Sequence, residues 1–236
     1  MIYTPNSKYV GSYGFNGSGI TKIIGSLVHT IGNAVGDYAF QGCTRLKYID
    51  LNISGIIGKN AFYNDYAVEY VDFSNSNITQ FSNASSNSSF SDIGKNRVSP
   101  STNILIFDFR KSTFSIIPGS LFGATQYLNI YFPSTVTTVY NFIYNANYNN
   151  VRFDSINPPT LNNSITLDTN KFFVPLDSYS DYHSATNWSA LTLDVWKHYI
   201  AGDTLDNNYN WYSDIRLTNQ VTGTAPETAD YYGVAI

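Results

Sequence analysis

The chain is poor in cysteine, in charge and in long apolar runs, and each shortage excludes a class of protein. Cys43 is the only cysteine among 236 residues, so no disulfide forms within the chain. Charged residues make up 13% of the sequence, well below the roughly 25% of an average soluble protein. The net charge is −4 and Lys and Arg do not cluster, which argues against a nucleic-acid partner. No apolar run reaches about 18 residues, so we expect no membrane span.

Motifs for catalysis and metal binding are also lacking. The histidines at 29, 183 and 198 show no H-x-x-x-H spacing, and neither a C-x-x-C pair nor a G-x-S-x-G or Walker-type loop occurs. The run GDTLDNN, with Asp203, Asp206 and Asn207, resembles a calcium loop only faintly, because the loop length and terminal Glu are missing. We therefore expect a plain turn there, and no enzyme, no metal and no cofactor.

A repeat with a period of 22 residues is the strongest positive signal. Val35–Leu51 reads VGDYAFQGCTRLKYIDL, and Ile57–Phe73 reads IGKNAFYNDYAVEYVDF, so that Phe40 corresponds to Phe62 at an offset of 22. A fixed period in this range indicates a solenoid, in which each unit buries its apolar face only against its neighbours. The Gly that precedes each D-Y-A-F-like element is expected where a side chain would clash in a tight turn.

Further copies extend the repeat along most of the chain. A first copy has Phe15 in the place of Phe40, and a later copy carries Phe122, Tyr127, Ile130 and Phe132. After it, Phe142, Tyr148, Val151 and Phe153 reproduce the spacing of Phe40, Leu46, Ile49 and Leu51. Ile104, Phe107 and Phe109 mark one more strand. The period-two alternation at the end of each copy predicts about six short parallel strands between Val10 and Phe153. We expect turns or short helices on the other side and buried repeat phenylalanines.

One segment interrupts the rhythm. Ser74–Asn103 is rich in Ser and Asn, and we interpret it as one repeat that carries a surface insertion, with Ser82–Asn103 as a protruding loop. The predicted organisation is a solenoid over residues 8–156 with an insertion at about 74–103, a closing segment over 157–190 and a tail over 191–236.

The pattern I-G-x-x-A-F-x-G-C-x-x-L-x-x-I-x-L resembles the BspA-type leucine-rich repeat, which is found in surface proteins of gut and oral bacteria and in some of their phages. Val35–Leu51 matches it almost position for position, including Gly42 and Cys43, a cysteine that we expect to be buried. The later V-P, Tyr182 and Trp188 are similar to the segment that often closes such arrays. The resemblance implies a leucine-rich-repeat-like solenoid and a binding role, but no particular ligand.

The family resemblance also bears on location. Surface members would normally carry an export signal, yet the first residues lack a basic segment followed by an apolar core. The open alternatives are a trimmed chain, an intracellular role or a phage virion protein that leaves the cell by lysis. Because Met1 shortly precedes the first repeat and the chain is rich in Asn and Tyr, we favour a virion, with a bacterial cell surface as the other expected location.

The exposed face of the predicted sheet supplies candidate binding residues. Aligning the units puts two columns of side chains on this face, and we select from them Tyr48, Asp50, Tyr70, Asp72, Asp108, Asn129, Tyr131 and Arg152. Aromatic rings beside carboxylates suit sugar hydroxyls, but tyrosines also favour protein contacts. The alternative is that the aspartates only keep the sheet soluble and prevent edge association.

The tail keeps many aromatic residues after the repeat has ended. We expect a helix around LDVWKHYI, since Leu193, Trp196 and Ile200 would share one face. The tail either folds back on its own solenoid or docks onto another subunit, and we assign the docking role to Trp211, Tyr212, Tyr231 and Tyr232.

Two functions remain open on the sequence. One is a non-catalytic adhesion module that contacts a host surface glycan or protein. The other is a structural protein of a larger virion or surface assembly, in which the repeat array is a rigid spacer.

Overall fold

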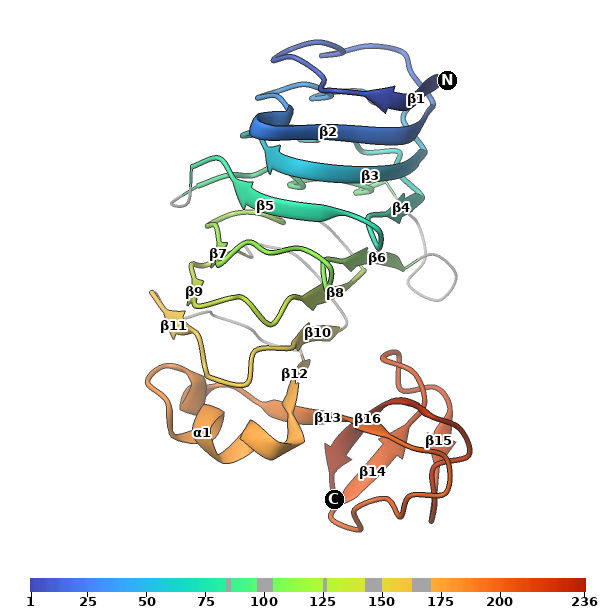
Figure 1. Ribbon diagram of the computed structural model, residues 1–236, viewed down its shortest axis with the longest axis vertical. Coiled ribbons are helices and arrows are strands. Elements are labelled where there is room, and N and C mark those ends of the chain that lie inside the picture. The colour runs from blue at the N-terminus through green and yellow to red at the C-terminus, as the bar shows by residue number, and fades with distance from the viewer. Residues whose placement is uncertain (84–85, 97–103, 125–126, 143–149, 163–170) are drawn as a thin grey trace.

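The computed structural model describes residues 1–83, 86–96, 104–124, 127–142, 150–162 and 171–236. Its backbone winds through stacked turns, with the two termini near opposite ends of the stack (Figure 1). Each turn adds a parallel strand to one wall: β1 (Ile2–Ser7), β2 (Lys22–Val35), β3 (Tyr48–Ile57), β4 (Tyr70–Asp72), β6 (Leu105–Asp108), β8 (Leu128–Phe132), β10 (Asn150–Phe153) and β12 (Lys171–Pro175). The predicted repeat solenoid is confirmed.

Shorter strands form a second wall. They are β5 (Asn77–Phe81), which pairs with β3, and the three strands β7 (Ile116–Ile117), β9 (Thr138–Val139) and β11 (Thr160–Leu161). Tight turns make up the third side, where neighbouring units approach closely. A Cβ added to Gly36 would lie 2.4 Å from the backbone nitrogen of Ser12, and one added to Gly58 would lie 2.4 Å from that of Asp37. The repeat therefore requires glycine at this position because its turns stack in contact.

The first wall consists of two sheets. Strands β1 to β4 form one continuous ladder, and β6 begins the ladder that continues through β8, β10 and β12. Strands β4 and β6 are neighbours along the stack but belong to different sheets (Figure 1). The wall thus has a seam between β4 and β6.

A ladder of phenylalanine rings fills the solenoid. Phe15 lies 5.5 Å from Phe40, Phe40 lies 5.1 Å from Phe62, and Phe62 lies 5.7 Å from Phe90. The ladder then reaches Phe122, whose ring centroid is 5.4 Å from that of Phe90. From Phe40 onward these rings are fully buried. Cys43 is also fully buried, as expected.

Phe90 corrects the interpretation of the polar segment. The prediction of a protruding loop over Ser82–Asn103 is wrong for Ser86–Asn96, because Phe90 and Ile93 lie in the core. The backbone N–H of Phe62 donates to Ser89, and that of Phe90 donates to Leu121, so this stretch is a stacked turn like the others. Ser89 and Ser91 made this stretch look polar, but both are buried, and their hydroxyls donate to the carbonyls of Gly58 and Ser120. Residues 97–103 of the predicted insertion lie outside the described residues.

The closing segment packs against the last turns. It contains the short helices η1 (Leu176–Ser178), α1 (Tyr179–Ser184) and η2 (Trp188–Ala190). Trp188 is fully buried, packs edge-on against Phe153 and donates its Nε1–H to the Pro159 carbonyl at 2.6 Å. The Tyr182 hydroxyl donates to the Ser155 carbonyl at 2.8 Å. Both ring donors are therefore satisfied within the core.

The expected helix in the tail is instead a strand. Strand β13 (Leu193–Tyr199) pairs in parallel with β12 and antiparallel with β16 (Ala229–Ala235), which also pairs with β14 (Tyr209–Tyr212). A further strand, β15 (Gln220–Val221), pairs with β14. Leu193 and Val195 alternate inward, and the open edge of β12 supplies backbone partners that a helix would leave unused. We call residues 191–236 the C-terminal module.

Phe90 provides a test of the corrected core. Replacing Phe90 with Ala should lower the free energy of unfolding by about 3–5 kcal/mol, because a fully buried ring between two stacked rings is lost. Urea unfolding followed by circular dichroism measures this change. Tyr13→Ala serves as the control, since that ring is 60% exposed. If both substitutions had an equally small effect, Phe90 would not be a core residue, and Ser86–Asn96 would be a surface segment as first predicted.

A buried carboxyl lies beside the phenylalanine ladder. Asp65 is fully buried, and its Oδ1 accepts a hydrogen bond from the Cys43 backbone N–H at 2.8 Å. Its Oδ2 is buried without a partner among the described residues. Burial raises the pKa of Asp65 well above its ordinary value, although the Cys43 N–H lowers it in part. The folded state therefore favours the neutral acid.

Asp65 should make stability depend on pH. The unfolded chain releases this proton near a pKa of about 3.9, whereas the folded chain holds it to higher pH. Stability from this group is thus present below about pH 4 and is lost as pH rises toward the folded pKa. Asp65→Asn keeps an acceptor for Cys43 and does not titrate, so its stability relative to the natural chain should increase from pH 4 upward. A constant difference between pH 4 and pH 8 in urea titrations would contradict this account.

Candidate functional site

The two outward columns lie in the predicted register. In the first sheet, Lys22, Tyr48 and Tyr70 are paired across β2, β3 and β4, and so are Ile24, Asp50 and Asp72. In the second sheet the corresponding sets are Ile106, Asn129 and Asn150, and Asp108, Tyr131 and Arg152. The alignment of the units is therefore confirmed, but the two sheets differ in what covers them.

A stack of three side chains lies on the first sheet. The Lys22 ammonium lies 4.0 Å from the centroid of the Tyr48 ring, and the Tyr48 and Tyr70 rings stack at 4.3 Å with 6° between their planes. Both faces of Tyr48 are therefore covered, so this ring offers no free face to a ligand. Tyr70 is 41% exposed and is covered by Tyr48 on one face only. Of this pair, Tyr70 is the ring that can accept a ligand.

The paired carboxylates beside this stack differ in their bonding. Asp72 accepts hydrogen bonds from the Ser74 backbone N–H at 2.8 Å and from the Tyr70 hydroxyl at 3.4 Å. Partial burial, together with the nearby Asp72, Tyr48 and Asp50, raises the pKa of Tyr70 to about 12, so its hydroxyl stays protonated at neutral pH. The Asp50 carboxylate is half-buried and has no hydrogen-bond partner in the part of the chain that the structure describes.

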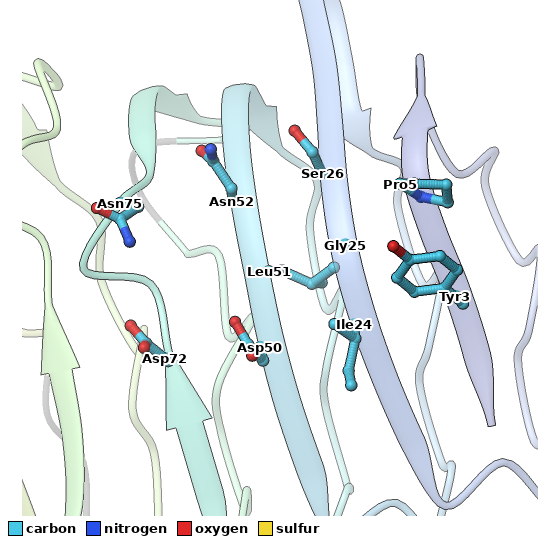
Figure 2. Close-up of a pocket in the computed structure, with 10 residues that line it drawn as sticks. All are labelled: Tyr3, Pro5, Ile24, Gly25, Ser26, Asp50, Leu51, Asn52, Asp72 and Asn75. Atoms are coloured by element: carbon cyan, nitrogen blue, oxygen red, sulfur yellow. The ribbon is translucent and has the colours of Figure 1, made fainter.

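A pocket opens over Asp50 and Asp72. Its volume is about 250 Å³, and Figure 2 shows its lining residues on strands β1 to β4 and, for Asn75, on the turn after β4. Besides the two aspartates, the polar members of the lining are Tyr3, Ser26, Asn52 and Asn75. Asn75 accepts a hydrogen bond from Lys111 at 2.7 Å, whereas Asn52 and the Tyr3 hydroxyl have no partner among the described residues. The pocket thus offers an amide, a hydroxyl and a carboxylate to a small polar ligand.

The C-terminal module covers the second sheet. Asn129 and Arg152 are buried, so the expectation that they face solvent is wrong. Tyr131 is half-buried against Phe173, Ile215 and Tyr232. Asn129 has both amide atoms buried without a partner among the described residues. Aligning the repeats correctly predicts which side chains share one face of the sheet. The alignment does not reveal that a later segment of the chain folds over that face.

Arg152 holds the module in place. Its guanidinium lies 3.5 Å from the Trp196 ring centroid, and it bonds Asp154 at 2.6 Å, Asp230 at 2.8 Å and the Tyr232 hydroxyl at 2.9 Å. Burial alone would raise the pKa of Asp230, but the nearby Arg152 and His198 lower it by more than burial raises it. The pKa of Asp230 is therefore below its ordinary value. The ion pair joins β10 of the solenoid to β16 of the module.

Asp108 takes part in the same charge network. Arg110 bonds the Asp108 carboxylate at 2.7 Å and reaches Asp230 at 3.4 Å, and His198 lies 2.8 Å from Asp230. The Asp108 charge is thus already compensated within the chain. Unlike Asp50, it is not available to a ligand without breaking an ion pair.

The residues assigned to docking lie mostly inside the module. Trp211, Tyr231 and Tyr232 are buried, and Tyr212 is half-exposed. The Trp211 ring packs against Tyr199 of the module at 5.2 Å, whereas the Tyr232 ring packs against Phe173 of β12 at 5.3 Å. The tail thus folds back on its own solenoid, which was the alternative to docking. The alternation of Leu193 and Val195 is the sequence signal for a strand. The helical spacing of Leu193, Trp196 and Ile200 led to the wrong prediction of a helix instead.

The stacked turns and the parallel strands of the first wall together describe a solenoid repeat protein. A comparison with known families matches residues 1–89 and 76–169 to the BspA type leucine rich repeat region, in 6 copies. The chain belongs to this family. Its repeats are generally surface-associated and adhesion-type modules, and the family is typically non-catalytic. A comparison with curated proteins found no match. No helix among the described residues is long and apolar enough to cross a membrane.

Breaking the Arg152–Asp230 pair should loosen the C-terminal module. Arg152→Ala removes the cation of Asp154 and leaves Asp230 with only the longer Arg110 contact and His198, all in a partly buried site, and we expect a loss of about 3–5 kcal/mol in the free energy of unfolding. Limited proteolysis should then cleave within residues 191–236 first. Lys47→Ala is the control, since its pair with Glu69 is exposed and should contribute at most about 1 kcal/mol. Equal effects of the two variants would contradict the role given to Arg152.

Proposed function

We propose that this chain is a non-catalytic adhesion module that binds a glycan on a host cell surface through the pocket over Asp50 and Asp72. The observation that carries the proposal is the set of unpartnered polar groups in this pocket. Asp50 and Asn52 come from β3 and Tyr3 comes from β1, and all three line one concave site (Figure 2). Sugar hydroxyls both donate and accept hydrogen bonds, so they can satisfy a carboxylate, an amide and a phenol together.

The size of the pocket favours a sugar over a protein partner. A space of about 250 Å³ is below the usual range for drug-sized ligands, and it fits one sugar unit of a longer chain. A protein partner would need a wider contact, on the order of 800 Å² from each side. The membership in a family of surface and adhesion modules supports a role outside the cell, on a virion or on a bacterial surface.

The alternative is a rigid spacer within a larger virion or surface assembly. That role drew its support from aromatic residues in the tail, and three of those four are buried within the chain itself. The free polar groups on the first sheet have no purpose in a spacer. The binding role therefore accounts for more of the molecule.

Two substitutions in the pocket test the proposal. Glycan-array screening of the full chain identifies a ligand, and calorimetry measures its affinity. The double variant Asp50→Asn, Asn52→Ala should weaken binding at least tenfold, because two convergent polar contacts are changed. Asp181→Asn, on an exposed carboxylate of α1, is the matched control and should bind as the natural chain does.

Two results would overturn the proposal. One is unchanged affinity in the double variant with its fold intact by circular dichroism. The other is a chain that binds no glycan on the array but assembles into a defined multimer, which would favour the spacer.

A further inference from the structure

A second pocket lies at the seam between the two sheets. Its volume is about 230 Å³, and its walls come from β4 with Tyr70 and Val71, and from β6 with the flanking Ile104, Leu105 and Ile106. Glu69 and Arg216 complete the lining. Arg216 belongs to the C-terminal module, so this pocket is built jointly by the solenoid and the module. The pocket over Asp50 shares none of these residues.

The aromatic wall of the seam pocket is the free end of the exposed stack. Lys22 covers one face of Tyr48, and Tyr48 covers one face of Tyr70, which leaves the other side of Tyr70 toward the seam. Ile104 and Ile106 are half-buried and line the same space. A ligand here meets an aromatic ring and two aliphatic side chains, which suits a flat group with an apolar face.

The charges at the pocket favour an anion. Glu69 is already paired with Lys47 at 2.9 Å, so its charge is largely compensated. Arg216 is exposed, and its guanidinium forms no ion pair within the described ranges of the chain. A guanidinium binds a carboxylate through two parallel hydrogen bonds, which fixes both its position and its orientation. The uncompensated charge at the seam is therefore positive.

The backbone on both sides of Arg216 is anchored. Ile215 is buried beside Phe173, and its carbonyl accepts a hydrogen bond from the Asn150 side chain of β10. The Arg216 N–H donates to the Asp214 carboxylate at 2.9 Å, and Asn219 donates to the same carboxylate at 2.9 Å. The loop thus presents Arg216 from a fixed base, which reduces the entropy lost when it binds a ligand.

We propose that the seam pocket binds a sugar unit that carries a carboxylate, with its apolar ring face on Tyr70 and its carboxylate on Arg216. Both hexuronic and sialic acids have this chemistry. The inference rests on the proposed glycan-binding function and adds an acidic subsite to it. The C-terminal module then has a role in recognition, because it supplies the cation that the solenoid lacks at this point.

Calorimetry of the full chain with matched oligosaccharides tests the proposal. The probes are a trigalacturonate, a sialyllactose, the carboxyl-reduced form of the trigalacturonate, and lactose. The first two distinguish the two acid sources. We expect at least one acidic probe to bind at least tenfold more tightly than its neutral counterpart, and to weaken between 50 and 500 mM salt as an ionic contact does.

Variants assign the effect to Arg216. Arg216→Gln should remove the tenfold preference and the salt dependence, whereas Arg45→Gln, on an exposed arginine that does not line this pocket, should change neither. Equal binding of acidic and neutral probes, or equal behaviour of the two variants, would overturn the proposal, and so would an acidic peptide that binds while no acidic sugar does. The proposed function would still stand in that case if the chain bound a neutral glycan and if this binding depended on Asp50 and Asn52. Failure of every glycan to bind would overturn both this inference and the proposed function.

Discussion

Each turn of this protein can bury its phenylalanine only between the rings of the turns before and after it. Phe62, for example, has Phe40 at 5.1 Å and Phe90 at 5.7 Å. This constraint fixes the distance between successive turns along the stack, and the strands of the first wall follow that spacing. The register that brings Asp50 beside Asp72 is thus a consequence of core packing. The exposed face of the first sheet inherits its geometry from the rings beneath it.

The sequence predicts this part of the molecule well because the repeat is a local signal. The offset of 22 between Phe40 and Phe62 is enough to place Tyr48 beside Tyr70, and the strand register agrees. Phe90 escaped notice because extra residues change its spacing and its neighbours are serines. Those serines are buried as hydrogen-bond partners, which composition alone does not reveal.

The tail shows where sequence reasoning ends. The strand β13 forms because β12 offers an open edge, and a long-range backbone partner overrides the helical spacing of Leu193, Trp196 and Ile200. The module then buries Arg152 against Asp230, a residue 78 positions away. No pattern within the repeats contains that information. As a result, only the part of the predicted exposed face on β1 to β4 remains open to solvent. The pocket that contains Arg216 lies at the edge of this part, between β4 and β6.

Hydroxyl-radical footprinting of the full chain, with and without the bound glycan, tests the central claim that recognition belongs to the first sheet and its seam. The account predicts that the glycan protects Tyr3 and Tyr70, which are 65% and 41% exposed, and leaves Tyr212 as reactive as before. Buried Tyr231 should stay unreactive in both states. Protection of Tyr212, with Tyr3 and Tyr70 unchanged, would contradict the account and place recognition on the C-terminal module alone.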